Sequence, residues 1–117
     1  MSEYILHQQM LPAPELITAM TGASVAIGTL LYPPVKLILD NQSTSAVVIS
    51  VSVGGIGGPI QWKTFEGNEA LILDDDLYTF PKGTIFYGNG AANGSFCISY
   101  TYLHSTQYEV PVIPYAA

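Results

Sequence analysis

The residues best suited to chemistry are three consecutive carboxylates, Asp74, Asp75 and Asp76. Carboxylate oxygens are hard ligands that suit calcium, and the nearby Asn68 or Glu69 could add a further oxygen. Adjacent residues of an extended chain point to opposite faces, so at most two of the three could converge without a sharp turn. The alternative is a solvated acidic loop, and the residue pattern favours that loop over a calcium site.

Residues able to act as a nucleophile or a base are few. Cys97 is the single cysteine, and His7 and His104 are the two histidines. Cys97 and His104 are seven residues apart, which on an extended strand separates them, and neither histidine lies in a zinc-ligand pattern. The glycine run at 54–58 is not followed by the Lys and Ser or Thr of a phosphate loop. We therefore predict no enzymatic activity, no catalytic residue, no metal and no cofactor.

The composition excludes several classes of partner. The chain has 117 residues, of which 49% are hydrophobic and only 10% charged, with a net charge of −6. Because all three basic residues are lysines and acidic residues outnumber them, nucleic acid and anionic membranes are poor partners. The start, MSEYILHQQM, has no secretory pattern, and one cysteine excludes an internal disulfide. We expect a protein made in the cytoplasm and not secreted.

The stretch 69–103 organises the expected fold. It contains three predicted strands, at 69–73, 84–88 and 95–103, separated by polar, glycine-rich turns. The last strand alternates: Phe96, Ile98, Tyr100 and Tyr102 share one face, and Cys97, Ser99 and Thr101 share the other. We predict an all-β, single-domain β-sandwich or jelly roll of seven or eight short antiparallel strands.

Other segments add local predictions. The segments 35–41 and 46–53 flank a polar connection of hairpin length, so we expect them to pair as a hairpin. Residues 14–20 could form a short helical turn that starts at a proline. In the segment 23–32, Gly28 predicts a bulge or kink. We expect the sandwich core to span 23–103, with an N-terminal arm at 1–14 and a C-terminal arm at 104–117, whose prolines at 111 and 114 limit sheet pairing.

Part of the chain resembles a known class of proteins. The segments GNEALILD (67–74), FPKGTIFY (80–87) and GSFCISYTY (94–102) resemble small β-sandwich virion structural proteins of tailed bacteriophages, of the decoration, cement, collar or tail-attachment type. The resemblance covers about 35–103 and implies no catalytic residues. It implies a subunit of the virion that stabilises a phage particle, made in the host cytoplasm. Its expected partners are copies of itself, with a trimer favoured, and the major capsid protein or another neighbouring virion protein.

Aromatic residues suggest two kinds of contact surface. Tyrosine offers a large contact area with a polar end, so we expect Tyr4, Tyr108 and Tyr115 in the arms to lie at subunit interfaces. The alternative function is a carbohydrate- or receptor-binding β-sandwich, such as a tail, fibre or lectin-like module. There Trp62 would stack on the ligand, with the aspartates at 74–76 as hydrogen-bonding or calcium-binding partners. A single tryptophan on a strand is more often part of a core.

The acidic run yields a simple test. Calcium bound to the folded state alone would raise the melting temperature, and EDTA would reverse the rise. We expect no change at millimolar calcium, because a solvated loop offers no preformed set of ligands. Differential scanning fluorimetry with calcium, with magnesium and with EDTA checks this, and a rise specific to calcium would establish a site at Asp74, Asp75 and Asp76.

Overall fold

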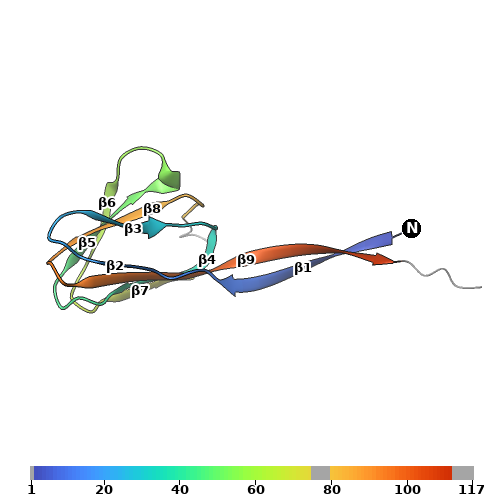
Figure 1. Ribbon diagram of the computed structural model, residues 1–117, viewed down its shortest axis with the longest axis horizontal. Helices are drawn as coiled ribbons and strands as arrows, with labels where there is room; N and C mark the ends of the chain where they lie inside the picture. Colours follow the sequence, from blue (N-terminus) through green and yellow to red (C-terminus); the bar gives the residue numbers. More distant parts are fainter. Residues whose placement is uncertain (1, 75–79, 112–117) are drawn as a thin grey trace, which may run out of the picture.

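The protein folds into two antiparallel sheets that face each other, with a long two-stranded extension at one end (Figure 1). This computed structural model describes residues 2–74 and 80–111. Sheet A has the strand order β1-β9-β4-β7, with β2 also paired to β9, and sheet B has the order β3-β8-β5-β6. The nine strands in these residues are β1 (Ser2–Pro12), β2 (Leu16–Ala19), β3 (Val25–Thr29), β4 (Pro34–Asn41), β5 (Val47–Ser52), β6 (Ile60–Phe65), β7 (Ala70–Leu73), β8 (Ile85–Gly90) and β9 (Ser95–Pro111), and a 3-10 turn, η1 (Val53–Gly55), follows β5.

The core lies between the inner faces of the two sheets. The predicted alternation of the last strand is confirmed, because Phe96, Ile98 and Tyr100 of β9 are buried. Their partners come from both sheets, and the buried apolar residues are Met20, Ile27, Leu30, Leu37, Leu39, Val47, Ile49, Val51, Phe65, Phe86, Phe96, Ile98 and Tyr100. The all-β sandwich is therefore confirmed, and the finer assignment to a jelly roll remains a prediction.

The predicted helical turn at 14–20 is wrong, since most of it is strand β2. β2 pairs with β9 from Leu16↔Ile98 to Ala19↔Ser95. Its residues alternate between partly buried and exposed, which is the period of a strand. A four-residue segment gains little from helix propensity, so pairing with β9 decides its conformation. This strand raises the described number to nine, above the predicted seven or eight.

The predicted hairpin of 35–41 with 46–53 is also wrong. β4 pairs with β7 and β9 in sheet A, whereas β5 pairs with β6 and β8 in sheet B. Both strands have an apolar face, and those faces meet across the core instead of lying side by side. The connection at 42–46 is thus a corner between the sheets.

A buried amide stabilises this corner. Asn41 is fully buried, and its side-chain Nδ2 donates to the carbonyl oxygens of Ser45 at 3.0 Å, Phe65 at 3.3 Å and Glu66 at 2.8 Å. Its Oδ1 accepts a bond from the backbone N–H of Ser43 at 2.9 Å. The side chain therefore joins the end of β4 to the end of β6 and to the corner itself.

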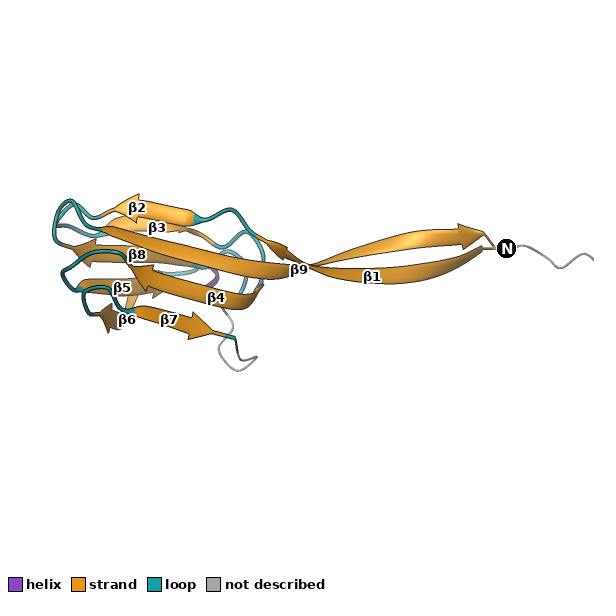
Figure 2. Ribbon diagram, turned by 90° about the horizontal axis from the view of Figure 1, so that it is seen from below, coloured by secondary structure: helices purple, strands orange, loops and turns teal. Residues whose placement is uncertain are grey.

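The extension is a ribbon formed by the two ends of the chain (Figure 2). β1 pairs with β9 without interruption from Ser2↔Pro111 to Pro12↔Thr101, whereas β4 pairs with β9 only as far as Pro34↔Tyr102. Residues 2–10 and 103–111, called the ribbon below, thus pair with each other alone over roughly 30 Å. The molecule measures 75 × 28 × 23 Å, and its radius of gyration is 19.5 Å, against about 13 Å for a compact chain of this length.

Over the described residues, the two arms expected from the sequence are therefore paired with each other, Ser2–Pro12 with Thr101–Pro111, and Pro114 lies outside the described residues. Pro111 does not prevent this pairing, because it is the last described residue of β9 and lies opposite Ser2. β9 is hydrogen-bonded beyond the predicted end at residue 103 because β1 offers it a partner strand.

Asn41 provides a test of the corner. Asn41→Ala removes an amide whose two N–H donors are shared among three carbonyl oxygens, so we expect the free energy of unfolding to fall by about 2–4 kcal/mol. Urea unfolding followed by tryptophan fluorescence measures this loss. Thr44→Ala at an exposed position of the same corner is the matched control, expected within about 0.5 kcal/mol of the native chain. Equal losses for the two variants would contradict this role of Asn41.

Candidate functional site

The acidic run is only partly covered by the structure. Asp74 is exposed just after β7, and Asp75 and Asp76 lie outside the described residues, so the predicted calcium site stays a prediction. Glu69 accepts a hydrogen bond from the backbone N–H of Glu66 at 2.9 Å and lies 3.1 Å from the Lys63 ammonium. These two contacts lower the pKa of Glu69. Within 2–74 and 80–111, no three metal-ligating side chains come together.

Trp62 packs toward the core. It is partly buried on β6, with its ring centroid 5.3 Å from that of Phe80 in a T-shaped contact and 6.2 Å from that of Phe65. Phe80 in turn lies edge-on to the buried Phe86, at 5.3 Å between centroids. These contacts match the core interpretation of Trp62 and leave less of its ring for stacking on a ligand.

Cys97 and His104 do not form a catalytic pair. They belong to opposite faces of β9 and are separated by seven residues, roughly 23 Å along the strand. The Cys97 thiol donates to Oε1 of Glu15 at 3.0 Å. Burial, followed by this contact with the Glu15 carboxylate, raises the pKa of Cys97 to about 12. The thiol is therefore protonated at neutral pH and is a poor nucleophile.

The predicted interface tyrosines belong to the ends of the chain. Tyr4 is opposite Glu109 in the ribbon, and Tyr108 is opposite Ile5. Tyr115 lies outside the described residues. The structure thus brings the strands of Tyr4 and Tyr108 together, and an interface role for all three tyrosines stays a prediction.

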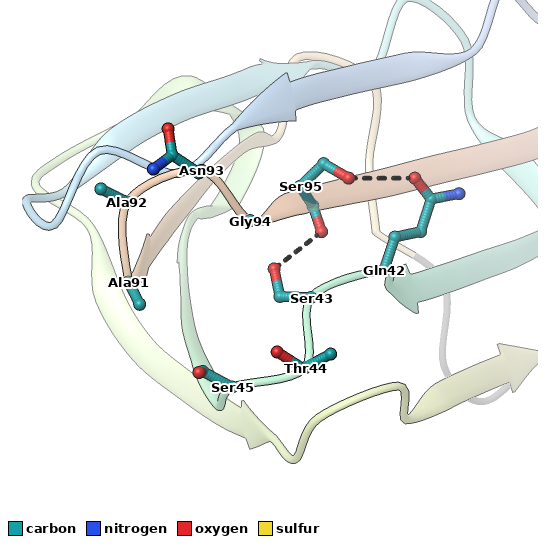
Figure 3. Close-up of a pocket in the computed structure, with 9 residues that line it drawn as sticks. All are labelled: Gln42, Ser43, Thr44, Ser45, Ala91, Ala92, Asn93, Gly94 and Ser95. Carbon is teal, nitrogen blue, oxygen red and sulfur yellow. Dashed lines mark hydrogen bonds between the residues drawn. The ribbon is translucent and has the colours of Figure 1, made fainter.

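A polar groove lies at the end of the sandwich away from the ribbon (Figure 3). Its volume is about 320 Å³, and the corner at 42–45 and the turn at 91–95 line it. Ser43 Oγ donates to the carbonyl oxygen of Ser95 at 3.1 Å, and Ser95 Oγ donates to Oε1 of Gln42 at 3.2 Å. No lining residue is charged or aromatic, so the groove offers weak hydrogen bonding and neither proton transfer nor stacking.

The outer face of sheet A is more apolar than the sequence analysis suggested. This face, which points away from the core, includes four large side chains with exposed fractions of 51–56%: Met10, Ile17, Ile72 and Leu103. Register places them on it, since Met10 is opposite Leu103, Ile17 opposite Cys97, and Ile72 opposite Ile38. The alternation of 95–103 predicted only the small outer residues of β9, which lie at the centre of this face. The exposed isoleucines were missed because they come from strands whose pairing the sequence left undetermined.

A second cavity of about 320 Å³ opens on this face beside the connection between the end of β1 at Pro12 and the start of β2 at Leu16. Its lining includes Glu15, Lys36, Ile38, Ser99 and Thr101. The hydroxyl of Thr101 is buried and has no hydrogen-bond partner in the described residues. This hydroxyl is the one buried side-chain oxygen or nitrogen found unsatisfied in that part of the chain.

Two side-chain contacts connect the base of the ribbon to the sandwich. The rings of Tyr32 and Tyr102 stack with centroids 3.8 Å apart and an interplanar angle of 8°. The hydroxyl of Tyr100 accepts a bond from the backbone N–H of Leu31 at 2.9 Å. Burial of Tyr102 and its contact with Tyr32 raise the pKa of Tyr102. The loop before β4 is thereby fixed across β9 at the point where the ribbon leaves the sheet.

Comparison with known proteins found no match to a family model, to a curated protein or to a solved structure. Among the described residues, no helix has the length and apolar character needed to cross a membrane. The fold defines a class, a two-sheet β-sandwich extended by a terminal ribbon. Function therefore has to be argued from the surfaces just described.

The pKa of Cys97 gives a test of its environment. At pH 8 we expect DTNB to react with native Cys97 at least tenfold more slowly than with the urea-unfolded chain, because the folded thiol titrates near 12 rather than near 9. Absorbance at 412 nm follows the reaction. Glu15→Ala, which removes the acceptor and a covering side chain, should accelerate it. Equal rates for native and unfolded protein would contradict the burial of the thiol.

Proposed function

We propose that this protein is a non-enzymatic structural subunit that assembles with copies of itself. The observation that supports this most is the ribbon, which leaves the sandwich with no third strand beside it in the described residues. A two-stranded ribbon in water is marginally stable on its own, and open strand edges attract further strands. A ribbon of roughly 30 Å is therefore best explained as a segment that packs against another subunit.

The surface chemistry supports the same proposal. Only 10% of the residues are charged, against roughly 25% in typical soluble domains, and large apolar side chains are exposed on sheet A. Both features suit a surface that is covered in an assembly. The specific form we propose, from the resemblance of 67–102, is a capsid decoration, cement or accessory subunit of a phage virion.

The carbohydrate- or receptor-binding alternative has less support. Trp62 packs against Phe80 and Phe65, so the one candidate stacking residue is engaged. The polar groove at 42–45 and 91–95 could bond a neutral hydroxylated ligand, but it lacks an aromatic lining. A flat Trp62 fluorescence titration across a panel of glycans would agree with this ranking, and a saturable shift would reverse it.

The mass of the protein in solution tests the proposal. Size-exclusion chromatography with light scattering should give a fixed multiple of the 12.5 kDa chain over a hundredfold range of concentration, with a trimer favoured. A constant mass of one chain would overturn self-assembly.

A ribbon variant makes the test specific. Met10 and Leu103 are opposite each other and half exposed, so Met10→Lys with Leu103→Lys should leave the sandwich folded and reduce the mass to one chain. The control is Ile56→Lys, 84% exposed in the turn after β5. Loss of assembly in the control alone would contradict a role for the ribbon.

A further inference from the structure

We propose that the outer face of sheet A, continued by the ribbon, is the surface through which copies of this chain pack around a symmetry axis parallel to β9. This inference rests on the proposed self-assembly and adds to it the contact face and the relative orientation of the subunits. The occupant of the face is a second copy of the chain.

The distribution of exposed apolar side chains supports this face. Single exposed isoleucines are ordinary on protein surfaces, whereas apolar residues that gather on one face mark contact sites. Ile17 on β2 and Ile72 on β7 lie on either side of β9 and β4, and Met10 and Leu103 continue the same face into the ribbon. Between them β9 presents small residues such as Ser99, and β4 presents Ile38 flanked by Lys36 and Asp40.

The cavity of about 320 Å³ is a second feature of this face. Thr101 in its lining marks the point where the sandwich continues into the ribbon, so one neighbour that enters the cavity would cover both parts.

The available area matches a stable interface. At the usual spacing, β9 and β4 over eight residues each, β2 and β7 over four each and the end of β1 present about 400 Å². The ribbon adds about 300 Å². The total of about 700 Å² per subunit lies within the range of specific interfaces, about 600–1,000 Å² per subunit, which neither part reaches alone. A partner that covers the sandwich face and the ribbon together therefore makes an interface of ordinary size.

An identical copy can do so in two orientations. If the axis is parallel to β9, the ribbons of all subunits run in the same direction and lie against one another. If the axis were perpendicular to β9 at the base of the ribbon, each ribbon would lie on the neighbouring sandwich face, but Lys36, opposite Thr101 at that base, would come close to the partner's Lys36, and like charges disfavour this orientation. The parallel axis applies to a dimer and to a trimer alike, because each subunit then turns the same face toward the axis.

The face carries one lysine and two carboxylates. Glu15 lies before β2 on one side of β9, and Lys36 and Asp40 lie in β4 on the other side. A symmetry axis parallel to β9 brings the β4 side of one subunit to the β2 side of the next. Lys36 would then face the partner subunit's Glu15, so opposite charges meet across the contact.

Cysteine cross-linking tests the face. Ser99 lies on the outer face of β9 in sheet A, and Ser50 lies on the outer face of β5 in sheet B; both are partly buried. Oxidation of Ser99→Cys should give disulfide-linked dimers on a non-reducing gel, whereas Ser50→Cys should give none. Native Cys97 contributes little to either reaction, because its thiol is buried and protonated.

Lysine substitutions measure the contribution of the face. Ile17→Lys and Ile72→Lys should each weaken association by about tenfold or more, since each puts a charge in place of an apolar side chain that the subunit contact would bury. Ile60→Lys, on sheet B and 68% exposed, is the matched control and should leave association unchanged. Circular dichroism confirms that each variant is folded.

The results of these experiments distinguish the proposal of self-assembly from the proposal that sheet A is the contact face. A monomeric native chain would overturn self-assembly and this inference together. A native oligomer that neither cross-links through Ser99→Cys nor weakens with Ile17→Lys and Ile72→Lys would overturn the contact face and leave self-assembly standing. Cross-linking through Ser50→Cys alone would assign the contact to sheet B instead.

Discussion

The pairing of β9 on both of its sides is the constraint on which the rest of the structure depends. Along its first half, β9 is bonded to β2 on one side and to β4 on the other, and its inner residues are the centre of the core. Beyond Tyr102 it retains only β1. One strand thus belongs to a well-packed sandwich and to an open ribbon, and the position of the ribbon is fixed by the sandwich.

The two ends of the sandwich differ in chemistry as a result. At the far end, Asn41 and the serines of the corner satisfy one another, and the groove there is polar and uncharged. At the ribbon end, stacked tyrosines support a segment whose neighbours in the described chain are few. Side-chain hydrogen bonds thus close the far end of the sandwich, and the ribbon end is formed by the backbone pairing of β1 with β9.

The sequence predicted the elements well wherever a strand alternates. The segments 69–73 and 35–41 match β7 and β4, and the bulge at Gly28 is present as a register shift between Ala26 and Gly28. The site predictions were tested less. Trp62 packs toward the core, as its place on a strand favoured, and Asp75 and Asp76 lie outside the described residues, so the calcium site stays a prediction. The apolar outer face of sheet A was missed because its residues are far apart in sequence.

The sequence by itself determined the strand period, the inner face of β9 and the low charge, because these depend on neighbouring residues and on composition. Only the tertiary structure decided that 16–19 is a strand, that β4 and β5 separate into different sheets, and that the two ends of the chain pair as a ribbon. Each of those features depends on a partner strand that is distant in sequence. The energy that stabilises a strand in a sheet comes from contacts with its partner strand, so it cannot be read from the segment alone.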